Sequence, residues 1–175
     1  MQLAPQQQQG PLPTEAERRH VFFSKAENWD REVLGIGRFR RQLVQQAHGN
    51  VLEVAAGTGR NFRYYDKKKV QSLTVADFCS SMLQQAKAKE HELEGIETFF
   101  LLGNACKLPK PSKPYDTIVQ TFALCSYEDP VKTLKALSEQ LQPADLEVVS
   151  LKRKNFGTTY MIIAKKKETN ETATE

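Results

Sequence analysis

Four apolar, β-branched runs separated by helical stretches constrain the fold of this chain most. The runs are "NVLEVAA" (50–56), "SLTVADF" (72–78), "TFFLLGN" (98–104) and "YDTIVQTF" (115–122). Helical patterns lie at "SSMLQQAKAKEHEL" (80–93), where Ser80 or Ser81 is expected as N-cap, and at "DPVKTLKALSEQL" (129–141). Near-continuous apolar strands alternating with helices are typical of a parallel sheet covered on both faces. The sequence therefore predicts an α/β fold with a mostly parallel sheet.

The regions outside these runs complete the domain plan. A polar, proline-rich opening predicts a flexible leader over 1–20, and the last residues, 168–175, predict a disordered tail. The remaining 21–167 form one domain, as the length of 175 residues allows. Apolar spacing over 24–47 predicts one helix, or two shorter helices because Gly35 and Gly37 weaken its middle. Arg38, Arg40 and Arg41 are interpreted as its solvent-exposed face in preference to a phosphate-binding patch. The terminal runs of "LEVVSLKRKNFGTTYMIIAKK" (146–166) predict an antiparallel hairpin.

Composition excludes several function classes. A net charge of +4 with lysine clusters broken by carboxylates indicates a solvated surface, so a nucleic-acid partner is not expected. Three cysteines without a Cys-x-x-Cys pair indicate neither a disulfide framework nor a metal site. Cys125 is interpreted as a buried apolar residue. No apolar run is long enough for a membrane span.

The turn after the first run, Gly57-Thr58-Gly59, is the expected ligand site because ligands bind at the carboxyl ends of strands in open α/β sheets. A phosphate loop would need a lysine and a Ser or Thr after the second glycine, and Arg60-Asn61-Phe62 stands there instead. A dinucleotide fingerprint needs a small residue where Phe62 stands, which disfavours a nicotinamide-dependent oxidoreductase.

Two carboxylates accompany this turn. Glu53 lies inside an apolar strand, where an unpaired charge is costly, so it needs backbone amides, a helix end or a cation as partner. Asp77 ends the second run, where a carboxylate can take both hydroxyls of a ribose or favour a helix N-terminus.

Together, "VLEVAAGTGRN", "LTVADFCSSML", "GNACKLP" and "YDTIVQTFALCSYEDP" resemble the first four motifs of the class I S-adenosylmethionine methyltransferases. The chain is most similar to the small-molecule type, and within it to mitochondrial methyltransferase-like proteins of the fungal Oms kind. The resemblance runs from about Trp29 to Lys166. It implies a Rossmann-like fold, S-adenosylmethionine as the cofactor and a mitochondrial location, with the cytoplasm as the alternative because the opening is not an Arg-rich, acid-poor leader.

The resemblance also implies cofactor-binding roles, while the catalytic residue remains unassigned. The methionine and ribose part would be lined by Glu53, Ala55, Gly57 and Gly59. The ribose hydroxyls and the adenine would be held by Asp77, Phe78, Met82, Asn104 and Ala105. The sulfonium and the substrate would be faced by Gln120 and Thr121. As alternatives, Met82 is helix core, Asn104 a turn former and Phe78 a strand-end packing residue.

The chain departs from the family pattern after 137–143. The family continues with a Gly-Gly turn, a fifth strand and a helix, whereas here "ADLEVVSL" follows Pro143 directly. A fifth-strand block is therefore predicted to be missing, unless "LEVVSL" itself is the fifth strand. Reduced cover of the sheet would favour self-association or a protein partner. The leading function is methyl transfer to a small-molecule acceptor, and the alternative is a catalytically silent relative that binds a partner.

Overall fold

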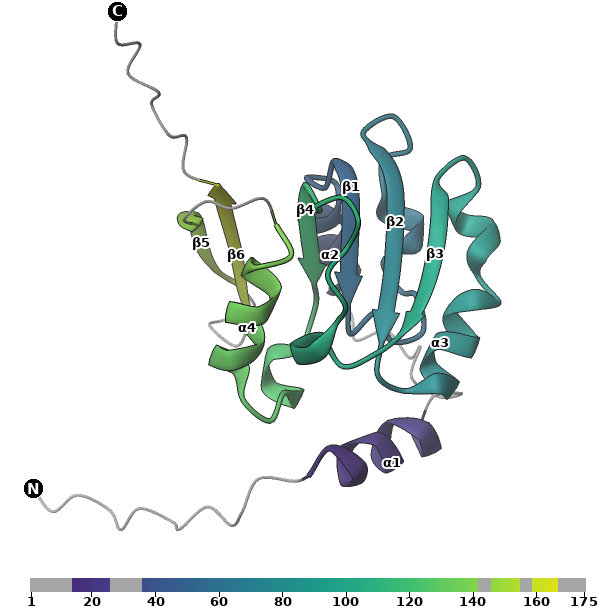
Figure 1. Cartoon of the computed structure of the whole chain (residues 1–175). Helices are drawn as coiled ribbons and strands as arrows, with labels where there is room; N and C mark the ends of the chain where they lie inside the picture. The colour runs from purple at the N-terminus through teal and green to yellow at the C-terminus, as the bar shows by residue number, and fades with distance from the viewer. Residues whose placement is uncertain (1–13, 26–35, 142–145, 155–158, 167–175) are drawn as a thin grey trace, which may run out of the picture.

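The computed structural model describes residues 14–25, 36–141, 146–154 and 159–166 (Figure 1). Its helices and strands, in chain order, are α1 (Glu15–Lys25), α2 (Ile36–Val44), β1 (Gly49–Val54), β2 (Val70–Asp77), α3 (Ser80–Lys87), β3 (Glu97–Leu102), β4 (Thr117–Gln120), α4 (Pro130–Ser138), β5 (Leu146–Lys154) and β6 (Thr159–Lys166). Short 3-10 turns complete them: η2 (Phe62–Tyr64), η3 (Glu90–Leu93), η4 (Ala105–Lys107) and η5 (Leu124–Ser126). The predicted tail, the hairpin loop and the middle of the predicted 24–47 helix lie outside the described residues.

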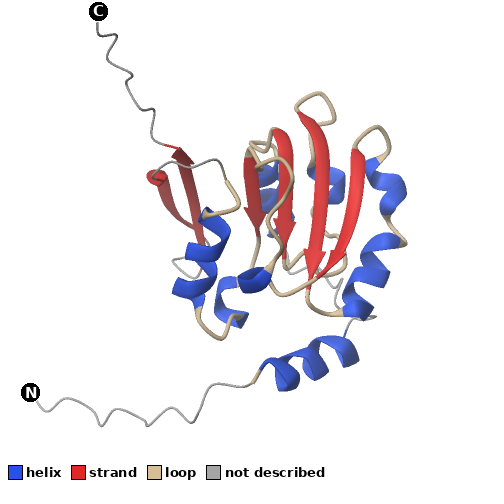
Figure 2. Cartoon of the chain, in the orientation of Figure 1, coloured by secondary structure: helices blue, strands red, loops and turns tan. Residues whose placement is uncertain are grey.

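The four predicted apolar runs form one parallel sheet in the order β3-β2-β1-β4. The chain runs outward from β1 to β3 and then returns to pair β4 with the other side of β1, Val54 standing opposite Gln120. Strand order thus reverses between β1 and β4, the place where open α/β sheets bind ligands. The α/β prediction is confirmed (Figure 2).

Alternate strand residues supply two cores, one on each face of the sheet. On one face, Val51, Leu73 and Val75 pack with Val44 of α2, Phe62 of η2 and Ala86 of α3. On the other face, Leu52, Val54 and Ala76 pack with Leu137 of α4. Burial on both faces explains why the strands read as almost unbroken apolar runs.

Helix α1 corrects the predicted leader, because residues 15–20 of the expected flexible 1–20 segment are helical. Thr14 and Glu17 form a capping box: the Glu17 carboxylate accepts from Thr14 N at 2.7 Å, and Thr14 Oγ1 accepts from Glu17 N at 3.3 Å. The Thr-x-x-Glu signature was visible in the sequence. The domain boundary at residue 20 therefore falls inside a helix.

The predicted N-cap of α3 is also wrong. The cap position is Cys79, which has no side-chain cap hydrogen bond, and Ser80 already belongs to the helix. Asp77 Oδ1 instead accepts from Cys79 N at 2.9 Å, which stabilises the turn before α3. Helix α4 begins as expected, with Asp129 Oδ1 accepting from Lys132 N at 2.9 Å and proline at its start.

The predicted C-terminal hairpin is confirmed, since β5 and β6 pair antiparallel in a two-stranded sheet of their own. "LEVVSL" is therefore not the fifth strand of the parallel sheet. Within the described residues that sheet ends at β4, extended only by a bridge between Tyr115 and Leu141. None of the helices in the described part of the chain is long and apolar enough to cross a membrane.

Candidate cofactor site

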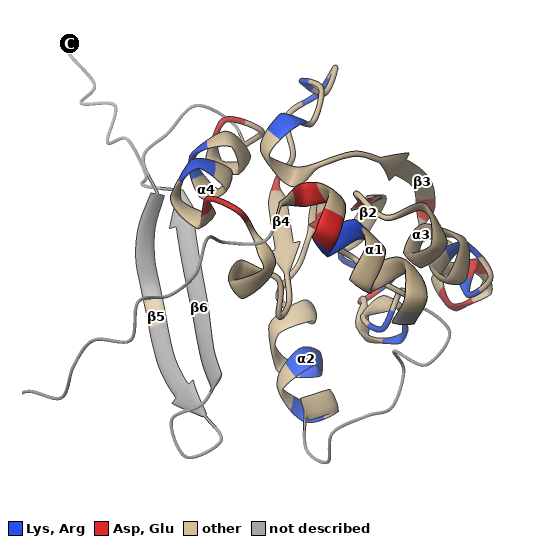
Figure 3. Ribbon diagram, turned by 90° about the horizontal axis from the view of Figure 1, so that it is seen from below, with Lys and Arg blue, Asp and Glu red and all other residues tan. Residues whose placement is uncertain are grey.

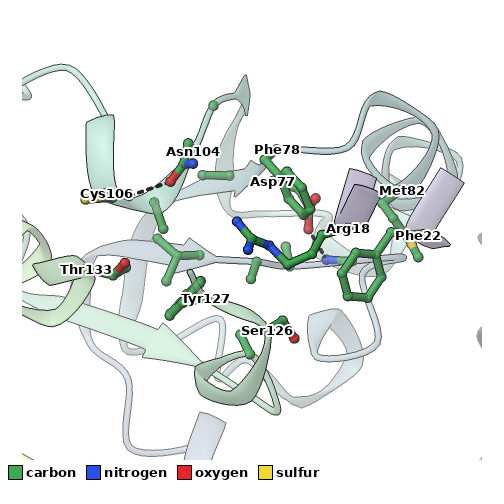
Figure 4. A pocket seen from close by; sticks show the side chains of 18 of the residues that line it. Arg18, Phe22, Asp77, Phe78, Met82, Asn104, Cys106, Ser126, Tyr127 and Thr133 are labelled. Carbon is green, nitrogen blue, oxygen red and sulfur yellow. Dashed lines mark hydrogen bonds between the residues drawn. The ribbon is translucent and has the colours of Figure 1, made fainter. Parts of the chain in front are cut away.

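A cavity of about 430 Å³ lies at the carboxyl ends of the four parallel strands. The turns after β1, β2, β3 and β4 line it, and α1 contributes Glu15, Arg18 and Phe22 from outside the sheet (Figure 4). This volume falls in the range of about 300–1,000 Å³ typical of small-molecule sites. The fold thus brings four separate sequence motifs to one hollow.

Most of the residues expected to bind the cofactor line this cavity. They are Ala55, Gly57, Asp77, Phe78, Met82, Asn104, Ala105 and Thr121. Three others lie behind the wall: Glu53, Gly59 and Gln120. Glu53 and Gln120 hydrogen-bond to the side chains of Asn61 and Tyr127, whereas Gly59 makes room for the buried Phe62 ring.

The Asp77 carboxylate stands at the end of β2 and is almost completely buried. Its Oδ2 accepts from Gly57 N at 2.8 Å and its Oδ1 from Cys79 N. Burial raises the pKa of Asp77, while the backbone donors of Cys79 and Gly57 act in the opposite direction. The backbone N–H of Phe78 acts in the same direction as these donors, and a carboxylate offers about four acceptor sites, so Asp77 can hold the turn and still accept from a ligand.

The glycine turn owes its shape to backbone conformations that other residues rarely adopt. Gly57 has φ +59°, and a Cβ built on it would meet nothing within 4 Å. A Cβ on Gly59 would lie 2.6 Å from the Phe62 ring, so Gly59 makes room for that buried ring and does not face the cavity. Ala55 has φ 50°, a strained value for a residue with a Cβ. The open space beside Gly57 therefore suits close approach of a ligand.

The hydrogen-bond partners of the buried Glu53 carboxylate differ from those expected from the sequence. Its direct partners are neither backbone amides nor a cation: Tyr65 Oη donates to Oε2 at 2.8 Å, and Asn61 Nδ2 donates to Oε1 at 2.9 Å. Burial raises the pKa of Glu53 to about 7, although both hydrogen bonds and the more distant Arg40 favour the ionised form. Asn61 and Tyr65 were missed because nothing local in the sequence marks them.

Arg40 corrects the prediction that it lies on the wet face of its helix, because only 8% of its surface is exposed. Its guanidinium lines the cavity and donates from Nη1 to Asn61 Oδ1 at 3.0 Å and to Thr121 Oγ1 at 2.6 Å. It also stacks 4.8 Å from the centre of the Phe122 ring. A buried positive charge thus stands beside Thr121, directly after the end of β4.

Helix α1 closes the adenine side proposed from the sequence. Glu15 Oε2 accepts from Asn104 Nδ2 at 2.8 Å, and the rings of Phe22 and Phe78 meet edge to face with centres 5.8 Å apart. The guanidinium of Arg18 pairs with Glu128 at 3.3 Å, beyond the end of β4. Asn104 also caps η4 by accepting from Cys106 N at 2.9 Å (Figure 4), so its turn-forming role is present.

The opposite wall follows β4. Tyr127 Oη donates to Gln120 Oε1 at 3.0 Å, which places Gln120 behind the wall and the Tyr127 side chain on it. Burial raises the pKa of Tyr127. Phe122 lines the cavity with φ 57° and 49% of its surface exposed, an unusual conformation for a bulky residue. Cys125 is exposed, contrary to the sequence interpretation.

Charges around the site are mixed. Seen from below, α1 carries both acidic and basic residues, whereas α2 and α4 carry basic residues (Figure 3). The cavity wall itself includes Arg18, Arg40, Lys107, Asp77 and Glu128. This arrangement favours a ligand that carries both charges.

Comparison with known proteins identifies the family. Residues 51–144 match the methyltransferase domain family, which covers β1 to α4 and therefore every turn expected to hold the cofactor. The chain belongs to this family, and its fold is that of the S-adenosylmethionine-dependent class I methyltransferases.

Two curated relatives and one solved structure illustrate the relationship. The chain is 30% identical over 207 residues to the mitochondrial methyltransferase OMS1 of Saccharomyces cerevisiae, covering 83% of this chain and 44% of that protein. It is 30% identical over 135 residues to the demethylmenaquinone methyltransferase of Thermus thermophilus, covering 71% and 60%. The fold matches magnesium protoporphyrin IX methyltransferase from Synechocystis, solved with bound S-adenosylmethionine, at a TM-score of 0.62 and 13% identity over 84% of this chain and 95% of that one.

These relatives are longer than this chain, which spans about half their length (44% and 60%). The alignment with OMS1 is 207 residues long, whereas the aligned part of this chain, 83% of 175 residues, is about 145 residues long. About 60 positions of the relative therefore have no counterpart here. The family match ends at residue 144, and β5 begins at Leu146. These figures agree with a block missing between α4 and the hairpin.

The residues present fit S-adenosylmethionine, the cofactor of this family. The open space beside Gly57 admits a ligand, Asp77 offers acceptors for hydroxyl groups, and Phe78 offers an aromatic face on the cavity wall. The cofactor supplies a methyl group activated on a positively charged sulfur.

Proposed function

We propose that this chain holds S-adenosylmethionine in the cavity and directs methyl transfer to a small-molecule acceptor that enters beside β4. The observation that carries the proposal is one cavity lined both by Asp77, Phe78 and Asn104 and by Thr121, Phe122 and Tyr127. The first set belongs to the motifs of the cofactor half. The second follows β4, on the opposite side of the point where strand order reverses.

Each cofactor-side residue has a role that its contacts support. Asp77 would accept from the ribose hydroxyls while it holds the Gly57 turn, and Phe78 would pack on the adenine. Met82, buried against Phe22 and Phe78, would fill the space beside them. Asn104 and Ala105 would meet the adenine edge, which requires Asn104 to share or exchange its bond to Glu15. Ala55 would lie beside the methionine part.

The remaining predicted residues would act from behind the wall. Glu53 would act through Asn61, Gly59 by making room for Phe62, and Gln120 by holding the Tyr127 hydroxyl. Alignment of the acceptor and exclusion of water are the contributions expected of the protein in such a transfer. Helix α1 supplies the exclusion, since it lines the cavity from outside the sheet.

The acceptor we propose is apolar and aromatic. Phe122 and Tyr127 give the β4 side of the cavity aromatic side chains, and an aromatic ligand can stack on them. A relative named for demethylmenaquinone, an aromatic ring compound, supports this choice. The name of the mitochondrial OMS1 relative supports a mitochondrial location.

Transfer of radiolabelled methyl groups tests this function. The purified chain is incubated with labelled S-adenosylmethionine and either a lipid-soluble metabolite extract or a protein extract, beside the Asp77→Asn variant. The proposal predicts label in the lipid-soluble metabolites with the native chain and strongly reduced label with the variant. Label confined to the protein extract, or equal label with both chains, would contradict it.

A second function, that of a silent relative binding a partner, is favoured by one observation: the approximately 60 positions of OMS1 that this chain lacks. The substrate-facing part of the domain would then be incomplete while the cofactor turns, all before residue 144, are intact. S-adenosylhomocysteine binding without turnover in any extract would favour this second function. Turnover by a monomer would eliminate it.

A further inference from the structure

The Thr121 hydroxyl at the end of β4 has a constrained hydrogen-bonding role. Arg40 Nη1 donates to Thr121 Oγ1 at 2.6 Å, and Asn61 Nδ2 donates to the same oxygen at 3.1 Å. A guanidinium can only donate, so the Asn61 atom that faces Arg40 must be its acceptor Oδ1. The orientation of the Asn61 amide is thereby fixed, with Nδ2 toward Glu53 and Thr121.

A hydroxyl group has two acceptor lone pairs and one proton to donate. Both lone pairs of Thr121 Oγ1 are taken by the two donors, so only the proton remains available to a ligand. Among the described residues no acceptor receives this proton, and Thr121 lines the cavity. The hydroxyl is thus committed to donating toward the cavity.

The charge behind the hydroxyl decides which acceptor suits it. Arg40 is in direct contact with Thr121 Oγ1, whereas the Glu53 carboxylate lies one residue further away, behind Asn61. Asp77 stands on the β2 side of the same cavity. Because Coulomb interactions weaken with distance, the potential at the hydroxyl is dominated by the guanidinium. A negatively charged oxygen is the best partner for such a donor.

We propose that Thr121, backed by Arg40 and oriented by Asn61, is a subsite for an anionic oxygen of a bound ligand. This deepens the proposed function and rests on it. Two sources share this chemistry: the carboxylate of the cofactor's methionine part, and an ionised hydroxyl on the acceptor. Val54 pairs with Gln120, so Thr121 adjoins the Ala55 end of β1 and both sources are within the same cavity.

Binding measurements on three chains separate the sources. The native chain, Thr121→Val and Thr121→Ser are titrated with S-adenosylhomocysteine and with 5′-methylthioadenosine, which lacks the amino-acid part. If the cofactor carboxylate occupies the subsite, Thr121→Val weakens S-adenosylhomocysteine binding roughly tenfold, the scale of a hydrogen bond to a charged group. Methylthioadenosine binding stays unchanged, and Thr121→Ser, which keeps the hydroxyl, behaves like the native chain.

The second arm uses 4-nitrophenol, whose ionisation is read by absorbance, with and without S-adenosylhomocysteine. If an acceptor oxygen occupies the subsite, the bound probe ionises about one pH unit lower in the native and Thr121→Ser chains than in Thr121→Val, a tenfold preference for the anion. Equal behaviour of all three chains in both arms, or no saturable binding of the anionic probes, would overturn the subsite. Failure of both nucleosides to bind would instead refute the cofactor site, because methylthioadenosine does not need Thr121.

Discussion

Glu53 shows how a carboxylate can be buried inside an apolar strand. Its carboxylate is completely enclosed, yet it receives hydrogen bonds from Tyr65 and Asn61 and lies near the positive Arg40. These partners therefore offset part of the cost of burying the carboxylate, and the remaining cost appears as a pKa raised to about 7.

The raised pKa of Glu53 predicts a pH-dependent stability. The carboxyl of Glu53 has its ordinary pKa of 4.5 in the unfolded chain and a pKa of about 7 in the folded chain, so between these pH values the folded state binds more protons. The free energy of unfolding should therefore fall by about 3 kcal/mol as pH rises through this window, at about 1.4 kcal/mol per pKa unit. Urea unfolding at several pH values measures it.

The matched variants are Glu53→Gln, which has no proton to lose, and Glu97→Gln at an exposed position. The slope attributed to Glu53 should disappear in the first variant and persist in the second. An unchanged slope in Glu53→Gln would assign the pH dependence to another group.

A second residue-scale prediction concerns Asp77. Asp77→Asn keeps the shape of the side chain but removes its charge and one acceptor, so S-adenosylhomocysteine binding should weaken by about 1–3 kcal/mol. Asp66→Asn, on the loop before β2, should bind normally. Native affinity in a folded Asp77→Asn chain would remove Asp77 from the ribose site.

At the scale of elements, α1 is attached to the domain mainly through side chains that also border the cavity. Phe22 packs with Phe78 and Met82, whereas its neighbour Phe23 has 60% of its surface exposed. Phe22→Ala should therefore loosen α1 and speed trypsin cleavage after Arg18 and Arg19 roughly tenfold, as expected for losing about 1–2 kcal/mol of contact. Equal cleavage of Phe22→Ala and the control Phe23→Ala would show that α1 is not held by this contact.

The strands and the turns that line the cavity could be predicted from the sequence. Strands buried on both faces appear as continuous apolar runs, and the first turn is marked by its Gly-x-Gly pattern. The positions of Arg40 and α1 could not. An arginine on an amphipathic helix is expected to face solvent unless its partners in the fold are known. The partners of Arg40, Asn61 and Thr121, are 21 and 81 residues away in the sequence. The Thr14–Glu17 capping box is a signal for the start of α1, but the polar, proline-rich opening before it favoured a flexible leader.

For the whole molecule, the exposed apolar side chains of α4 decide how the chain associates. Val131 and Leu134, three residues apart on one helix face, are 63% and 47% exposed. Such a surface favours self-association. Sizing chromatography should show concentration-dependent association that Leu134→Glu reduces, while Lys135→Glu on the same helix does not. A strictly monomeric native chain would contradict the prediction.

The central claim, that the turns of β1 to β4 form an S-adenosylmethionine site, is tested most directly by calorimetry on the full chain. S-adenosylhomocysteine, S-adenosylmethionine and NAD are titrated in parallel. The structure predicts saturable one-to-one binding of the first two compounds and no binding of NAD. A dinucleotide-binding turn needs a small residue three positions after Gly59, and here the bulky Phe62 occupies that position and packs against Gly59. Binding of NAD, or absence of binding by both S-adenosyl compounds, would contradict the account.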